Sequence, residues 1–251
     1  MRVFRLELYR FFYDWIYYIY FFLAMLLGFA FSLLNVHDLR SVVHQIFGSA
    51  GYMYGALCSM AVICTFVGKD FSYRTIHNKI STGGKRESLL TATFLCVSLC
   101  EIPVIVIFPA SSILSAGILS GWGTQLGKDF LFLICSPSFL KSILAYVIGI
   151  MGFSAACILI TIACRDMAKS LGLSTAYIIV CVMMTQKIFY LDSLQKLRQF
   201  ISIIPLYQML ANIREGYIDN HGFQAVVFCA AIWFLAAYIL SLLLFRFERL
   251  K

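Results

Sequence analysis

Long uncharged apolar stretches alternate with short polar ones along this chain. A helix that crosses a bilayer needs about 20 apolar residues to span roughly 30 Å of hydrocarbon. Six stretches reach or approach that length: residues 15–34, 45–68, 88–119, 142–164, 170–186 and 222–245. The pattern therefore predicts an all-α polytopic membrane protein, with six transmembrane helices in a single domain that covers residues 1–251.

Two polar stretches predict helices that do not cross the membrane. Residues 1–14 interleave charged and apolar side chains, which is typical of an interfacial helix lying at the inner leaflet. In residues 187–221, apolar positions recur every three or four residues on both sides of Pro205. This spacing predicts two short amphipathic helices that lie on the outer leaflet or dip into it.

The most polar stretch, residues 69–87, lies between the second and third predicted spans. It predicts a short helix over 70–82, because Asp70 or Ser72 could cap its start and Gly83 could end it. One face would be apolar and carry Tyr73, Ile76 and Ile80. The other face would be polar and carry Arg74, Asn78 and Ser81. Two-faced helices of this kind suit docking to another protein, and the alternative is a solvated basic loop that only fixes the topology.

Composition and charge agree with a membrane protein. Only 13% of the residues are charged, whereas a soluble domain has about 25%. The net charge of +8 does not indicate nucleic-acid binding, because the basic residues are spread between the apolar stretches rather than gathered in one patch. If the N-terminus is inside, 13 of the 20 lysines and arginines fall on the inner side. This bias predicts a multi-pass protein of the cell membrane with both termini in the cytoplasm.

Familiar catalytic and nucleotide-binding motifs are missing from the sequence. The patterns GxxxxGK[ST], HExxH and GxSxG do not occur, so we expect no P-loop, zinc-protease or serine-hydrolase site. The four histidines fall on both sides of the predicted membrane, and the nine cysteines show no zinc-binding spacing. We therefore expect this chain to bind no cofactor or metal itself.

Small residues four positions apart mark places where membrane helices can approach closely. The second and fourth predicted spans contain such pairs. They are Gly51 with Gly55, Ala145 with Gly149, and Gly152 with Ala156. We expect helix–helix contacts at these positions.

Glu101 is the one acidic residue embedded in a predicted span, two residues before Pro103. An ionisable residue at this depth faces protein or a water-filled path, because lipid contact is too costly. Two interpretations remain open: Glu101 belongs to the substrate path, or it is a structural hydrogen-bond partner. Since no basic residue lies inside the spans, we expect a hydroxyl or backbone partner, with Ser98 or the carbonyl of Val97 as candidates.

The layout resembles the six-helix permease subunits of ABC exporters, the class that includes bacterial peptide, lantibiotic and drug exporters. The local similarity is in residues 69–86, where these permeases place an acidic residue, a Thr-Ile pair, a small-residue turn and a basic residue. Here those positions are Asp70, Thr75 with Ile76, Ser81 to Gly84, and Lys85 with Arg86.

This resemblance implies that the helix over 70–82 is a cytoplasmic coupling helix. It would dock on a separate ABC-type ATPase subunit, which would bind ATP and Mg. The residues implied to contact the ATPase are Phe71, Arg74, Thr75, Asn78 and Lys79. A second permease subunit, identical or different, would complete the translocation path. The implied cargo is hydrophobic or amphipathic, with peptides as the first expectation and lipids or drugs next, and the outer segment would cap the exit.

Two other function classes stay open at this point. A polytopic secondary transporter would show an internal repeat, and none is clear in the sequence. An intramembrane enzyme would need converging polar groups, and Glu101 alone is plainly embedded. Neither alternative would need an ATPase partner.

Overall fold

The computed structural model describes residues 2–34, 43, 46–73, 75, 86–120, 128, 132, 134–190, 202–213 and 217–247. Over these residues every regular element is a helix, and six of the helices are long and apolar enough to cross a membrane. The long helices are α2 (Trp15–Leu34), α4 (Ser49–Ser72), α6 (Arg86–Ser120), α8 (Pro137–Cys164), α9 (Met167–Tyr190) and α12 (Asn220–Phe247). The prediction of an all-helical multi-pass membrane protein is confirmed.

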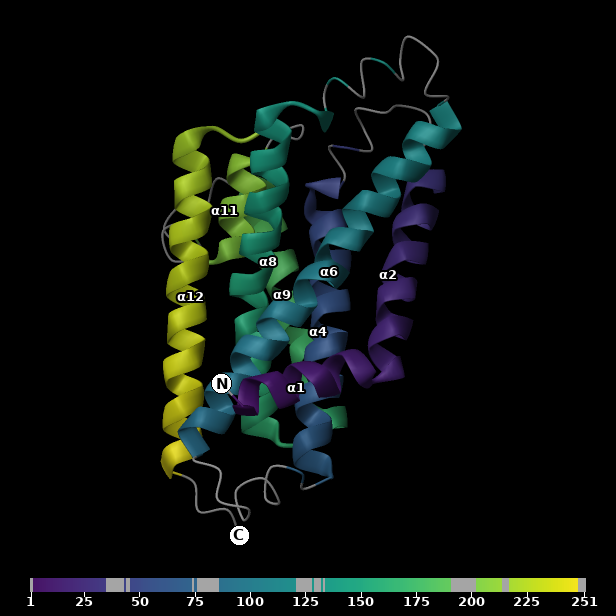
Figure 1. Cartoon of the computed structure of the whole chain (residues 1–251). Helices are drawn as coiled ribbons and strands as arrows, with labels where there is room; N and C mark the ends of the chain where they lie inside the picture. Colours follow the sequence, from purple (N-terminus) through teal and green to yellow (C-terminus); the bar gives the residue numbers. More distant parts are fainter. Residues whose placement is uncertain are drawn as a thin grey trace.

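Two shorter helices complete the described fold: α1 (Arg2–Tyr13) and α11 (Pro205–Asn212). Figure 1 shows the six long helices side by side, with α1 lying across them near one end. The start of α1 and the end of α12 lie at that same end of the bundle. The side of the membrane that this end faces stays a prediction from the charge distribution.

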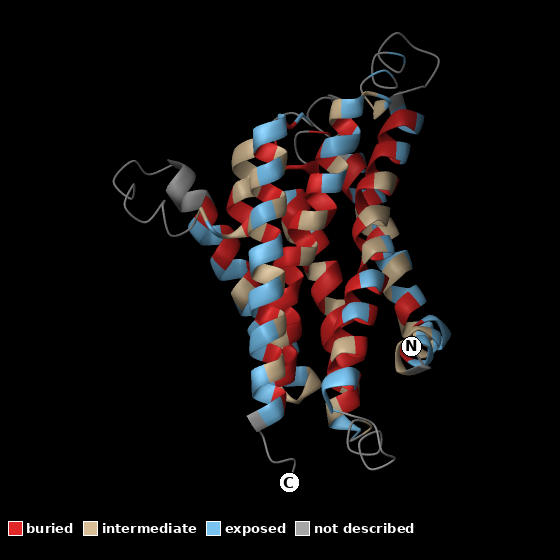
Figure 2. Cartoon of the chain, turned by 60° about the vertical axis from the view of Figure 1, so that its left-hand side comes forward, coloured by how far each residue is buried: buried red, intermediate tan, exposed pale blue. Residues whose placement is uncertain are grey.

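Helices α4, α6 and α8 form the centre of the bundle. Well over half of each is buried inside the chain, whereas under a third of α2, α9 and α12 is buried. Figure 2 shows the consequence on α12, whose outward side is exposed along its length. The exposed side chains of the outer helices are largely apolar, as expected of surfaces that meet lipid tails rather than water.

The central helix α6 is the longest, with 35 residues, and its length of about 52 Å exceeds the hydrocarbon thickness. It runs obliquely across the bundle, which accommodates the extra length (Figure 1). Pro103 and Pro109 lie inside it. Proline has no N–H to donate, so Pro103 leaves the carbonyl of Leu99 without its helical partner and weakens α6 just beyond Glu101.

Two glycines of α8 permit close contacts, as the spacing of small residues predicts. A Cβ at Gly152 would lie 2.6 Å from both the Cα and the Cβ of Ala230 in α12. A Cβ at Gly149 would collide with the side chain of Met209 in α11. Since Cβ atoms never approach backbone that closely, α8 and α12 can pack at this distance only with glycine at position 152.

Replacing Gly152 with alanine should therefore destabilise the bundle. We expect a loss of about 1–3 kcal/mol from overpacking, measured as a lower thermal unfolding temperature of the purified protein in detergent. Gly172 of α9 is the matched control, because nothing lies within 4 Å of the Cβ position there. Gly172→Ala should be neutral or stabilise the helix by up to about 1 kcal/mol. Equal effects at the two positions would contradict the α8–α12 contact.

Candidate functional site

Glu101 lies at the junction of the three central helices. Its side chain projects from α6, is completely buried, and has hydroxyl groups of α4 and α8 as neighbours. Ser59 of α4 donates its Oγ–H to Oε2, and Ser154 of α8 contributes the hydroxyl 2.8 Å from Oε1. Each of the three residues is near the middle of its helix. We call Ser59, Glu101 and Ser154 the carboxyl node.

The structure corrects one detail of the sequence prediction. A hydroxyl partner for Glu101 was expected, and hydroxyls are what the structure shows, but Ser98 was the wrong choice. The Ser98 hydroxyl is buried and has no hydrogen-bond partner among the described residues. Periodicity along one helix can identify only neighbours on that helix, whereas the actual partners come from helices that are far away in sequence.

The arrangement at Ser154 bears on the charge of Glu101. The Ser154 Oγ lies 2.8 Å from Glu101 Oε1 and 3.0 Å from the carbonyl oxygen of Met151. A serine hydroxyl has one proton, so an ionised Glu101 would compete with Met151 for it. A protonated Glu101 that donates to Ser154 would leave the serine proton for Met151. In addition, no lysine or arginine of the described residues lies in the middle of a long helix to neutralise an anion.

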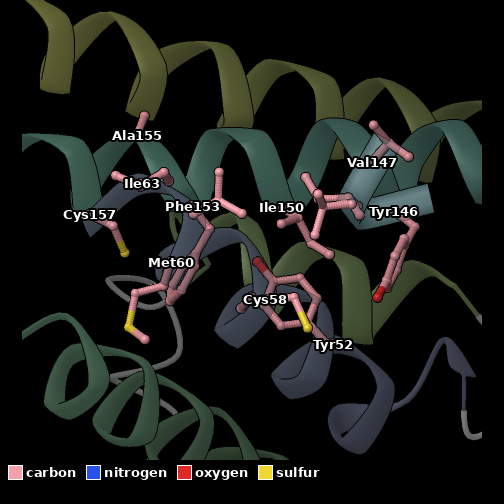
Figure 3. Packing of buried hydrophobic residues seen from close by; sticks show 14 of the residues in the cluster. Tyr52, Cys58, Met60, Ile63, Tyr146, Val147, Ile150, Phe153, Ala155 and Cys157 are labelled. Atoms are coloured by element: carbon pink, nitrogen blue, oxygen red, sulfur yellow. The ribbon is translucent and has the colours of Figure 1, made fainter. Parts of the chain in front are cut away.

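An aromatic layer lies beside the carboxyl node. Phe153 directly precedes Ser154 in α8. Its ring stacks on Tyr177 of α9, with the ring centroids 4.7 Å apart. Tyr52 of α4 packs edge-on against the same ring at 5.8 Å. Figure 3 shows Tyr52, Phe153 and Cys157 within one buried cluster. Phe153 and Ser154 are neighbours in α8, and this adjacency connects the layer to the node.

The Tyr52 hydroxyl in this layer is buried without a hydrogen-bond partner among the described residues. Buried polar atoms in native proteins are nearly always paired, so unpaired ones need an explanation. The Ser98 Oγ, three residues before Glu101 in α6, is buried and unpaired among the described residues as well. The centre of the bundle therefore contains more hydrogen-bonding capacity than its own side chains use.

No metal site accompanies these groups. Within the residues that the structure describes, no three His, Cys, Asp or Glu side chains are placed to hold a metal ion. All nine cysteines are free thiols, and only Cys135 is exposed. The chemistry available at the node is therefore that of a single carboxyl group with hydroxyl and aromatic neighbours.

A second polar cluster lies at the end of the bundle where α1 crosses α4. Arg10 donates to Asp70 at 2.5 Å, and Lys69 donates to Asp14 at 3.0 Å. The Arg10 guanidinium also lies 4.5 Å from the centre of the Phe66 ring. Burial alone would lower the pKa of Arg10, but its hydrogen bond to Asp70 and the negative charge of Asp70 raise that pKa overall. Two ion pairs thus attach α1 and the residue that follows it to the end of α4.

This cluster corrects the expected start of the short helix over 70–82. Asp70 does not cap a new helix, because it lies inside α4, which continues to Ser72. The Asp70 carboxylate instead accepts from Arg10, and Ser72 Oγ accepts from the backbone N–H of Met167, at the start of α9, at 3.4 Å. Both side chains thus bond to residues that are distant in sequence, which a local pattern does not reveal.

The structure describes two of the five residues expected to contact an ATPase. Phe71 is half-buried at the end of α4, and its ring packs edge-on against Phe245 of α12 at 6.4 Å. Thr75 is half-buried as well. Arg74, Asn78 and Lys79 lie outside the described residues, and so does most of the predicted helix over 70–82. No contact with a partner is tested by the structure.

Comparison with known proteins does not identify the chain. The sequence matches no known protein family, and no curated protein is significantly similar to it. The function must therefore be argued from the two polar clusters and from the arrangement of the helices.

The carboxyl node should contribute measurably to stability. Ser59→Ala and Ser154→Ala should each cost about 1 kcal/mol, the usual net value of one hydrogen bond. Glu101→Leu should cost more, because it removes both hydrogen bonds at once and takes the carboxyl partner from the buried Ser59 hydroxyl, although Ser154 can still donate to the Met151 carbonyl. Glu101→Gln keeps most of the hydrogen bonding. Thermal unfolding in detergent would measure all four variants. Full stability of Glu101→Leu would show that the node is dispensable.

The ion pair between Arg10 and Asp70 gives a second stability prediction. Reversing the charge in Asp70→Arg should cost about 3 kcal/mol, the low end for breaking a buried pair, because the Arg10 side chain is 34% exposed. The swapped double variant Arg10→Asp with Asp70→Arg should recover part of that loss. Chemical denaturation of the purified protein would measure both. No recovery in the double variant would mean that Asp70 acts through other contacts.

Proposed function

We propose that this chain is the membrane-spanning subunit of an ATP-driven exporter. Two copies, or this chain and a related one, would form the translocation path in the cell membrane. A separate ABC-type ATPase would bind ATP and Mg and dock at the end of the bundle where α4 ends and α6 begins. The cargo would be hydrophobic or amphipathic, with peptides as the first expectation.

The observation that carries this proposal is the anchoring of the last turns of α4. Arg10 and Lys69 attach this region to α1, and Ser72 contacts the start of α9. In addition, Phe71 packs on the end of α12. The segment that follows, residues 73–86, connects α4 to α6, two of the helices that meet at Glu101. A subunit that pushed on this segment would move the end of the bundle and the carboxyl node together.

The position of α11 supports a cargo exit that this helix covers, at the end of the bundle opposite to the proposed ATPase contact. The Met209 side chain of α11 packs against α8 at Gly149, where glycine has no side chain to block it. Leu206 of α11 is completely buried. Just before α11, the carbonyl of Ile203 accepts from the indole N–H of Trp233 at 2.7 Å. Trp233 lies in the middle of α12, so this partly exposed segment lies alongside the middle of that helix. Such a segment would have to move aside before cargo could leave.

One feature favours the alternative of a secondary transporter. A buried carboxyl in the middle of a bundle is typical of proton-coupled transporters, and Glu101 has that position. The two classes differ in their partners, because a secondary transporter functions without an ATPase. A test for the ATPase therefore separates them directly.

The decisive experiment is purification of the tagged chain from its native membrane in mild detergent. We expect an ATPase subunit to co-purify in a fixed ratio, and Arg74→Glu to reduce that ratio severalfold through charge repulsion at the polar interface. Lys141→Glu is the matched control, because this exposed lysine lies near the start of α8, at the opposite end of the bundle.

The control variant should co-purify with the ATPase as the original chain does. If no ATPase accompanies the original chain at any detergent concentration, the exporter proposal is wrong. If Arg74→Glu retains the ATPase fully, the proposal survives, but Arg74 is not part of the contact.

A further inference from the structure

We propose that the carboxyl node and the adjacent aromatic layer form a binding site for a positively charged group of the cargo. The site consists of the Glu101 carboxyl, the rings of Tyr52, Phe153 and Tyr177, and the unpaired hydroxyls around them. This inference rests on the proposed export function and specifies its substrate class, which is a cationic amphipathic molecule such as a peptide with a free amine.

The first argument is the chemistry of the residues. A carboxylate attracts a cation by its charge, and aromatic rings attract a cation through the negative face of the π system. Tyr52, Phe153 and Tyr177 come from three different helices and meet around one ring. Tyr52 and Ser59 are seven positions apart, so they share a face of α4 and place the aromatic layer and the node on the same side of that helix.

The second argument is the unused hydrogen-bonding capacity. Tyr52 is completely buried, yet its hydroxyl has no partner among the described residues. The hydroxyl of Ser98 is also buried and unpaired there. An ammonium or guanidinium group has several N–H donors, and these hydroxyls can accept from them. A bound cation would thus satisfy groups that the empty bundle leaves unpaired.

The third argument is that the site can open. The Glu101 carboxyl is held by two hydroxyl contacts from other helices, each worth about 1 kcal/mol net. Pro103, two residues beyond Glu101, interrupts the backbone hydrogen bonding of α6 and gives that helix a point of bending. Once α4 and α8 move away from α6, water can enter, Glu101 can ionise, and a cation can pair with it.

The test is direct binding of a hydrophobic cation to the full chain alone, reconstituted in lipid nanodiscs. Radiolabelled tetraphenylphosphonium is the probe, and tetraphenylborate is the competitor of the same shape and opposite charge. Empty nanodiscs provide the baseline for partition into lipid. We expect saturable phosphonium binding that tetraphenylborate does not displace.

Glu101→Gln should weaken this binding at least tenfold while keeping the size and position of the side chain. Glu87→Gln is the matched control, because Glu87 is an exposed acidic residue at the start of the same helix, α6. This control should bind as the original chain does. Unchanged affinity in Glu101→Gln, equal displacement by tetraphenylborate, or no saturable binding at all would overturn the inference.

A second measurement needs no variant and so does not depend on how Glu101→Gln folds. A hydrophobic carbodiimide should modify Glu101 in the original chain, as mapped by mass spectrometry, and phosphonium should reduce that modification. Absence of modification at Glu101, or modification that phosphonium leaves unchanged, would contradict the site. Both measurements use the chain without an ATPase, so their failure is distinguishable from a failure of the co-purification experiment.

Discussion

The hydrogen bonds of one buried carboxyl group hold the centre of this bundle together. Inside a membrane no water is available, so a polar group must find its partners in the protein. Glu101 finds them on two other helices, through Ser59 of α4 and Ser154 of α8. The three helices that meet there are also the three most buried ones. The carboxyl therefore fixes which faces of α4, α6 and α8 point at one another, while the lipid-facing helices pack around them.

At one end of the bundle ion pairs join the elements, whereas at its centre hydrogen bonds join the helices. Arg10 of α1 pairs with Asp70, and Asp14, which follows α1, pairs with Lys69, so two ion pairs join this region to the end of α4. The two clusters lie on the same helix, α4, which carries Ser59 in its middle and Asp70 in its last turn. A single continuous helix thus connects the ion pairs to the carboxyl node.

The sequence predicted the long helices well, because spans of apolar residues identify membrane helices without any knowledge of tertiary contacts. The extent of α2 agrees with the prediction, whereas α4 and α9 run several residues further into polar sequence. The buried position of Glu101 was also predictable, but Ser59 and Ser154 were not, because nothing local connects them to it. Asp70 was misread as a cap for a similar reason. A signal did exist near the N-terminus, where Glu7, Arg10 and Asp14 are spaced at i, i+3 and i+7, and the structure places all three on the side that is at least partly buried.

The central claim is that Glu101 is hydrogen-bonded to both serines in the folded protein, and infrared difference spectroscopy can read this directly. The carbonyl stretch of a carboxyl group shifts with the hydrogen bonds that the group makes. We expect a carboxyl band that is absent from Glu101→Gln and that changes frequency in Ser59→Ala and again in Ser154→Ala. A Glu101 band at the same frequency in the original chain and in both serine variants would contradict the account.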